Sequence, residues 1–253
     1  MDLPAADHLI LLIASLIANG FSALSGGGAG LIQLPMLIFL GLPFGVALAT
    51  HKVASVFLGV GAIFRHLRES HLERGFSLLI LGAGLPGVVL GAVSILHIPP
   101  AQATFALGVL TLGLGLYSVF KPQLGLVFNP KNRDGNGLLI GIAGLFVVGF
   151  LNGSITSGTG LFLTLWLIRH FGLDYKRAVA YTLILCGFIW NGTGALVLGS
   201  IGTVAWGWMP ALLLGSIVGG YLGSHFAIAK GNRWIKRAFE IATIAIGLKL
   251  IFF

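Results

Sequence analysis

The sequence of residues 25–30, SGGGAG, interrupts an apolar stretch that runs from residue 9 to residue 42. A second cluster at residues 153–160, GSITSGTG, interrupts another apolar stretch, residues 138–168. A bilayer core needs about 20 apolar residues per helix, so each stretch is too long for one straight span. The glycines permit the backbone angles of a sharp break. We therefore predict that each stretch forms a helical hairpin, either re-entrant or made of two short spans.

The composition around these clusters is that of a membrane protein. Of the 253 residues, 57% are hydrophobic and 9% are charged, whereas soluble domains average about 25% charged residues. There is too little polar surface to cover a globule, which excludes a soluble enzyme, a disordered tail and a disulfide-stapled secreted module. The net charge of +8 then indicates cytoplasmic loops beside anionic lipid rather than a nucleic-acid partner. We predict an all-α integral membrane protein, a polytopic helical bundle.

The basic residues predict how the chain crosses the membrane. Thirteen of the fifteen Lys and Arg residues lie in four connections, at residues 65–74, 121–133, 169–177 and 230–237. Basic loops normally face the cytoplasm, so we predict that all four are cytoplasmic and that both termini lie outside. The first hairpin then enters from the outer side and the second from the cytoplasmic side. The other predicted spans are residues 44–64, 75–96, 101–120, 175–198, 206–229 and 238–253.

The two halves of the chain repeat each other. Residues 28–31 (GAGL) align with residues 158–161 (GTGL), and Gly91 aligns with Gly223, at offsets of 130 to 132 residues. The predicted units are residues 1–120 and 138–253, each a glycine-broken hairpin plus three transmembrane helices. A cytoplasmic linker at residues 121–137 joins them within one membrane domain. Corresponding connections differ in charge, so the units are predicted to be inverted.

Inverted repeats with interrupted helices are typical of secondary transporters, whose substrate site lies where the interruptions meet. A duplicated membrane scaffold without transport is the alternative. Helices starting near Gly30 and Gly160 would direct their N-termini at the breaks, where free N–H groups and the positive helix end favour an anion. Hydroxyl groups of the two clusters could donate further hydrogen bonds. The alternative is that the glycines pack helices and the hydroxyls cap the backbone.

Lys52 is the only charged residue deep within a predicted full span. An intramembrane charge costs at least ~2.5 kcal/mol on insertion scales, so it normally faces a partner or a cavity. No acidic residue lies in the core of a neighbouring predicted span, which favours an anionic ligand or backbone carbonyls as the partner. A structural cap on the hairpin's carbonyl ends is the alternative role. His51 could relay protons near neutral pH or make a packing hydrogen bond.

The two glycine clusters, together with Ala49-Thr50-His51-Lys52, resemble the TauE/SafE family of sulfite and organosulfur-anion exporters. The resemblance runs from about Ile17 to the C-terminus. It implies transport of a small sulfur-containing anion across a bacterial or archaeal plasma membrane. Two positions depart from the family: His51 stands where relatives often have Asn, and Leu183 stands where some carry a second Lys. A site built around two lysines is therefore excluded.

We predict a secondary transporter, an exporter of a small sulfur-containing anion such as sulfite or an organosulfonate, in the prokaryotic plasma (inner) membrane. A channel-like anion facilitator is the alternative, followed by a membrane scaffold or enzyme subunit. No ATP, metal or hydrolase motif is recognised, so no enzyme activity, metal or cofactor is predicted. A coupled proton or other ion and a homo-oligomer stay open. The predicted substrate-binding residues are Ser25, Gly26, Gly27, Gly28, Gly30, His51, Lys52, Asn152, Ser154, Thr156, Ser157, Gly158, Thr159 and Gly160.

Overall fold

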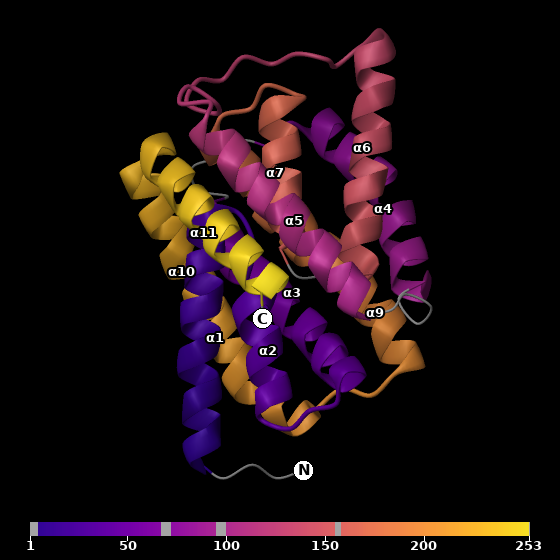
Figure 1. Ribbon diagram of the computed structural model, residues 1–253, viewed down its shortest axis with the longest axis vertical. Coiled ribbons are helices and arrows are strands. Elements are labelled where there is room, and N and C mark those ends of the chain that lie inside the picture. Colours follow the sequence, from indigo (N-terminus) through magenta and orange to yellow (C-terminus); the bar gives the residue numbers. More distant parts are fainter. Residues whose placement is uncertain (1–4, 67–71, 95–99, 155–157, 253) are drawn as a thin grey trace.

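The apolar runs fold into helices that pack side by side (Figure 1). The computed structural model describes the whole chain except residues 1–4, 67–71, 95–99, 155–157 and 253. The helices of the first half are α1 (Ala5–Ser25), α2 (Gly30–Phe39), α3 (Phe44–His66), α4 (Arg74–Ser94) and α5 (Pro100–Val119). Those of the second half are α6 (Gly135–Ser154), α7 (Thr159–Arg169), α8 (Tyr175–Tyr181), a π-helix (Thr182–Trp190), α9 (Asn191–Ile201), a 3₁₀ turn (Trp206–Trp208), α10 (Met209–Lys230) and α11 (Asn232–Phe252).

Six helical segments of the described chain are long and apolar enough to cross a membrane. They are Asp7–Ser25, Phe44–His66, Arg74–Ser94, Gly135–Ser154, Tyr175–Ser200 and Trp206–Lys230. The prediction of an all-helical, multi-pass membrane protein is therefore confirmed.

Each predicted hairpin consists of one long arm and one short arm. Helix α1 has 21 residues and α6 has 20, whereas α2 has 10 and α7 has 11. At 1.5 Å per residue a short arm reaches roughly 15 Å, about half of a bilayer core. Figure 1 shows α2 and α7 running from the middle of the bundle toward opposite ends. Two inverted units require their short arms to run in opposite directions. The inversion of the units in the membrane stays a prediction.

Glycine contacts follow the sequence repeat and cross between the halves. A Cβ placed on Gly91 of α4 would overlap the carbonyl oxygen of Phe150 in α6. Its repeat equivalent, Gly223 of α10, would overlap the carbonyl oxygen of Gly20 in α1. Phe150 and Gly20 are themselves 130 residues apart. The long arm α1 of the first half therefore packs on α10 of the second half, and the long arm α6 of the second half packs on α4 of the first. Small residues at both contacts let the backbones approach closely.

The four basic connections meet at one end of the bundle. Asn232 accepts a hydrogen bond from the backbone N–H of Lys176 at 2.8 Å and donates one to the carbonyl of Leu126 at 3.1 Å. An ion pair between Arg133 and Glu73 joins the remaining connection to this group. Figure 1 places the start of α1 and the α2–α3 turn at the other end. Basic loops that all face the cytoplasm must lie at one end of the bundle, as these do. That this end faces the cytoplasm stays a prediction.

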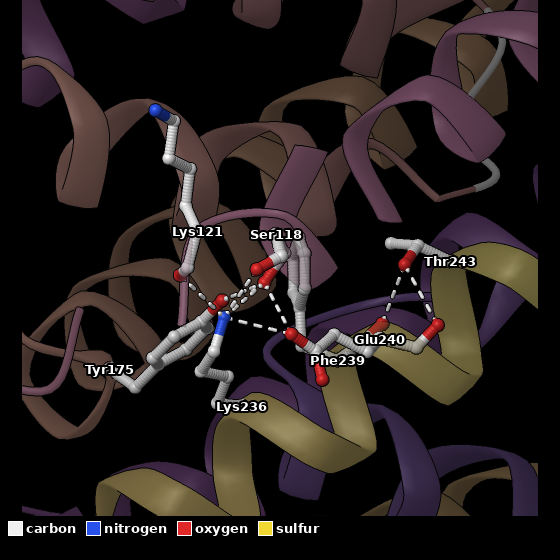
Figure 2. A network of polar contacts seen from close by, with 7 residues as sticks. All are labelled: Ser118, Lys121, Tyr175, Lys236, Phe239, Glu240 and Thr243. Carbon is white, nitrogen blue, oxygen red and sulfur yellow. Dashed lines mark hydrogen bonds and ion pairs between the residues drawn. The ribbon is translucent and has the colours of Figure 1, made fainter. Parts of the chain in front are cut away.

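The last helix starts six residues earlier than predicted, at Asn232 rather than at residue 238. The basic character of this segment suggested a loop, but Lys236 is buried in the helix and its charge is paired. Its ammonium lies 2.8 Å from the Glu240 carboxylate, one turn later, and donates to the carbonyl of Ser118 at 2.6 Å. Figure 2 shows Tyr175 completing this network between α5, α8 and α11. Pairing within the helix and with α5 thus lets α11 extend through a charged sequence.

Candidate functional site

The two breaks contact each other through their backbones. Thr164 of α7 donates a hydrogen bond of 2.9 Å to the carbonyl oxygen of Gly26. Gly27 has a φ of 147°, and a Cβ placed on it would overlap the backbone of Gly160 and Leu161. Only glycine tolerates both the conformation and the approach. The predicted meeting of the two interruptions is therefore present in the structure.

A small cavity lies at this meeting point, and its volume is about 40 Å³. A site of roughly 10–15 Å³ holds one water molecule, so the cavity has room for a few waters or one small ion. The starts of α2 and α7 border it, together with α1, α3, the end of α6 and the π-helix. The lining residues are Ser22, Gly27, Gly28, Ala29, Gly30, His51, Ser55, Leu58, Asn152, Gly158, Thr159, Gly160, Thr182, Leu183, Cys186, Gly187 and Asn191.

Eight of the fourteen predicted binding residues line this cavity: Gly27, Gly28, Gly30, His51, Asn152, Gly158, Thr159 and Gly160. Gly26 is not among the lining residues, and its carbonyl accepts a hydrogen bond from Thr164. The predicted residues Thr156 and Ser157 lie outside the described residues.

Two predicted hydroxyl donors bond to the local backbone. Ser25 donates to the carbonyl of Phe21 at 2.9 Å and lies 2.9 Å from the carbonyl of Gly27. Ser154 donates to the carbonyl of Phe150 at 2.8 Å. Serines at helix ends commonly compete for backbone groups in this way. Both contacts match the alternative in which hydroxyls cap the backbone of the broken helices.

Lys52 is fully buried and lies beside the cavity, bound to residues of its wall. Its ammonium donates to the backbone carbonyl of Asn152 at 2.7 Å and to the side-chain oxygen of the same residue at 3.0 Å. A third hydrogen bond, 3.1 Å long, goes to the side-chain oxygen of Asn191. All three acceptors are uncharged. The ammonium therefore caps the end of α6 while its positive charge stays next to the cavity.

Asn152 connects that charge to the cavity wall. Its amide nitrogen lies 3.0 Å from the Thr159 hydroxyl and 3.3 Å from the Cys186 sulfur. Thr159 is the first residue of α7, where the positive end of the helix dipole lies. A lysine charge, an oriented amide and a helix N-terminus thus converge on one side of the cavity.

His51 also lines the cavity and begins a chain of buried polar groups. Its Nδ1 lies 2.6 Å from the side-chain oxygen of Gln33, and its Nε2 lies 3.1 Å from the Ser55 hydroxyl. Because an amide oxygen only accepts, Nδ1 carries a hydrogen. Gln33 in turn donates to the hydroxyl of Ser15 at 2.9 Å. This chain links α3, α2 and α1, and it fits the packing role that the sequence left open for His51.

Five polar or polarisable lining residues were absent from the predicted set: Ser22, Ser55, Thr182, Cys186 and Asn191. Helical spacing could have identified Ser55, because it follows His51 by one turn and shares its face. Thr182 and Cys186 lie in the π-helix, inside an apolar run that gives no local signal. The π-helix turns this segment past the cavity, and such insertions occur frequently at functional sites.

Comparison with known proteins identifies the family of this chain. A family model described as sulfite exporter TauE/SafE matches residues 11–250. The chain belongs to the TauE/SafE family. The resemblance first carried by the two glycine clusters is thus confirmed over nearly the whole chain, and the clusters of this TauE/SafE protein are the breaks that meet at the cavity.

Several curated relatives match this TauE/SafE chain along almost its full length. "Probable membrane transporter protein ORF9" of a Sinorhizobium species is 29% identical, covering 97% of this chain and 94% of the relative. A "Probable membrane transporter protein" of Haemophilus influenzae is 28% identical, covering 100% and 97%. "Probable membrane transporter protein YfcA" of Escherichia coli K12 is 25% identical, covering 96% and 89%. No solved structure matches the chain. Family and relatives together identify a membrane transporter.

Proposed function

We propose that the cavity between the two breaks binds a small sulfur-containing anion, such as sulfite or an organosulfonate, and that the protein exports it. The observation that carries the proposal is the position of Lys52. Its charge lies beside the cavity, and its three hydrogen bonds go to uncharged oxygens. A buried charge is normally balanced by an opposite charge. A bound anion would supply that balance.

The helix starts add to the attraction for an anion. Helices α2 and α7 begin at Gly30 and Thr159, and both residues line the cavity. Each helix start carries a partial positive charge of about half an elementary charge. Two such ends and one ammonium group give the cavity a positive potential from three separate elements. Leu183 forms an apolar part of the wall, so a single lysine supplies the side-chain charge at this site.

The volume of the cavity supports a compact anion in this conformation. About 40 Å³ is available, against roughly 10–15 Å³ for one water. Sulfite, with four heavy atoms, fits this scale, whereas an organosulfonate with a carbon chain needs the walls to move apart. A pocket set between contacting backbones also favours a carrier over a channel, because a channel needs a continuous pore.

The wider arrangement follows from the same proposal. We place the protein in the prokaryotic plasma membrane with both termini outside and the two units inverted. The breaks would then lie near the midplane, where alternating access can expose one site to either side. His51 faces the cavity and leads into the Gln33–Ser15 chain, which gives a coupled proton a candidate route.

The decisive experiment combines binding and transport. Purified protein is titrated calorimetrically with sulfite, sulfoacetate, sulfate and chloride, and the same anions are tested for counterflow in proteoliposomes. We expect saturable sulfite binding, sulfite counterflow and weaker responses to chloride. Counterflow shows that one site is reached from both sides, which a channel does not require. Protein that folds but binds and exchanges none of the sulfur anions would overturn the proposal.

A further inference from the structure

A second hollow lies far from the cavity, at the end of the bundle where the basic connections meet. Its volume is about 580 Å³. It is formed by the connection after α5 and by the junction of α10 with α11. The residues that define its character are Gln123, Val127, Lys230, Arg233, Trp234 and Arg237. We call it the basic groove.

The basic groove carries three cations and no acidic residue among its described lining residues. Arg233 and Arg237 are one turn apart on α11, so they share a face of that helix. Glu240, the acidic residue of α11, is engaged elsewhere, because its carboxylate bonds to Lys236 and Ser118 (Figure 2). The groove therefore keeps a concentrated positive charge at the surface.

Apolar side chains are exposed among these cations. Trp234 is 53% exposed and Val127 is 72% exposed. The Lys230 ammonium lies 5.6 Å from the centre of the Trp234 ring. Tryptophan beside Lys and Arg is typical of the level at which lipid headgroups meet acyl chains. A soluble anion would use the charges alone, whereas a phospholipid uses the charges and the apolar surface together.

The groove is preformed by hydrogen bonds beneath it. Asn232 at the start of α11 joins the backbone N–H of Lys176 to the carbonyl of Leu126. This holds the connection after α5 against the α10–α11 junction. Fixed walls reduce the ordering cost of binding.

From these features we propose that the basic groove binds the headgroup of an anionic phospholipid. The phosphate contacts Arg233, Arg237 and Lys230, and the upper acyl chains lie against Trp234 and Val127. Basic pockets between transmembrane helices at a cytoplasmic surface recognise anionic headgroups by this chemistry. The site is separate from the transport cavity and does not depend on which anion is transported.

The test titrates detergent-purified full-length protein with short-chain phosphatidylglycerol, with phosphatidylcholine of the same chain length, and with inorganic phosphate. We expect phosphatidylglycerol to bind more tightly than either of the others. The double variant Arg233→Gln/Arg237→Gln should weaken phosphatidylglycerol binding roughly 30-fold, from the usual contribution of two cations near a membrane surface. Both arginines are exposed, so the variant should melt near the parental temperature, and Lys230→Gln provides a milder second variant.

The matched control removes two exposed cations at the same end of the bundle but outside the groove, with Lys131→Gln/Arg169→Gln. This control should retain most of the binding. Equal loss in both double variants would show a general surface-charge effect and overturn the site. Inorganic phosphate that binds as tightly as phosphatidylglycerol would also overturn it, since the groove would then be a soluble-anion site.

Discussion

The ammonium of Lys52 lies 2.7 Å from the backbone carbonyl oxygen of Asn152, a residue 100 positions later in the chain. This bond joins α3 of the first half to the end of α6, where the second hairpin breaks. Lys52 therefore has two effects that mutation can separate. Its hydrogen bonds hold the end of α6, and its charge sets the potential at the cavity.

Replacing Lys52 by Met should reduce both stability and anion binding. The two Asn152 oxygens lose the Lys52 donor, and loss of a donor to a buried acceptor costs about 1–3 kcal/mol. The Asn191 side-chain oxygen keeps a second donor, the Asn152 side-chain amide at 3.2 Å. We therefore expect a lower melting temperature in the absence of ligand. Loss of the charge should also weaken anion binding by about 10- to 100-fold. Normal anion affinity in the folded fraction would leave Lys52 with the capping role alone.

Asn191→Asp isolates the effect of charge. The new carboxylate would occupy the position of the amide oxygen, 3.1 Å from the Lys52 ammonium, and would neutralise it without removing its hydrogen bonds. We expect a melting temperature equal to or above that of the parent, and anion affinity reduced at least tenfold. Asn191→Ala is the control, since it removes the amide and adds no charge. If Asn191→Asp binds sulfite as well as Asn191→Ala does, Lys52 does not attract the anion electrostatically.

The fold was accessible from the sequence because its strongest determinants are local. Apolar length predicts helices, and the clusters at residues 25–30 and 153–160 predict where two of them break. The start of α11 was misplaced because the hydrogen bond from Lys236 to Ser118 is a tertiary contact with α5, although the pairing of Lys236 with Glu240 is local. A basic segment looks like a loop until its partners on α5 are known.

The site was accessible only in part, for a related reason. The glycine clusters at the breaks were predicted, because glycine gives a clear signal in the sequence. A cap on carbonyl ends was one of the roles predicted for Lys52, and the Asn152 carbonyl is such a partner. The side-chain acceptors on Asn152 and Asn191 were not foreseen as its partners, because these residues lie on different helices. Nor does an apolar sequence reveal that Thr182 and Cys186 turn toward the cavity in a π-helix. Side-chain direction across helices is a property of packing, which residue spacing alone does not specify.

Membrane orientation can be tested with two introduced cysteines. Asn136 and Ser200 are both exposed, and the single native cysteine, Cys186, is buried. We expect Ser200→Cys to react with a membrane-impermeant maleimide in intact cells and Asn136→Cys to react only after permeabilisation. The parental chain controls for labelling of Cys186. Labelling of both positions in intact cells would contradict the placement of the basic connections in the cytoplasm.

The Lys236–Glu240 pair should contribute far more to stability than the surface pair Arg133–Glu73. The side chains of the first pair are 9% and 18% exposed, against 30% and 53% for the second. Breaking a buried pair leaves an uncompensated charge and costs about 3–5 kcal/mol, whereas a surface pair contributes about 0–1 kcal/mol. Glu240→Gln should therefore lower the melting temperature clearly and Glu73→Gln only slightly. Equal decreases in melting temperature would show that the network in Figure 2 does not stabilise the fold more than a surface ion pair does.

Gly27→Ala should abolish transport, because the two breaks can approach each other only if this position lacks a side chain. A Cβ here would overlap Leu161 and Gly160 at the start of α7, and the φ of 147° adds strain. The control is Gly41→Ala, because Gly41 also has a positive φ, 98°, but open space around its Cβ position. Both variants pay the backbone cost of roughly 1–3 kcal/mol, so their difference isolates the contact between the breaks. We expect Gly41→Ala to keep sulfite counterflow per folded molecule and Gly27→Ala to lose it. Equal counterflow in the two variants would mean that transport does not require the breaks to touch.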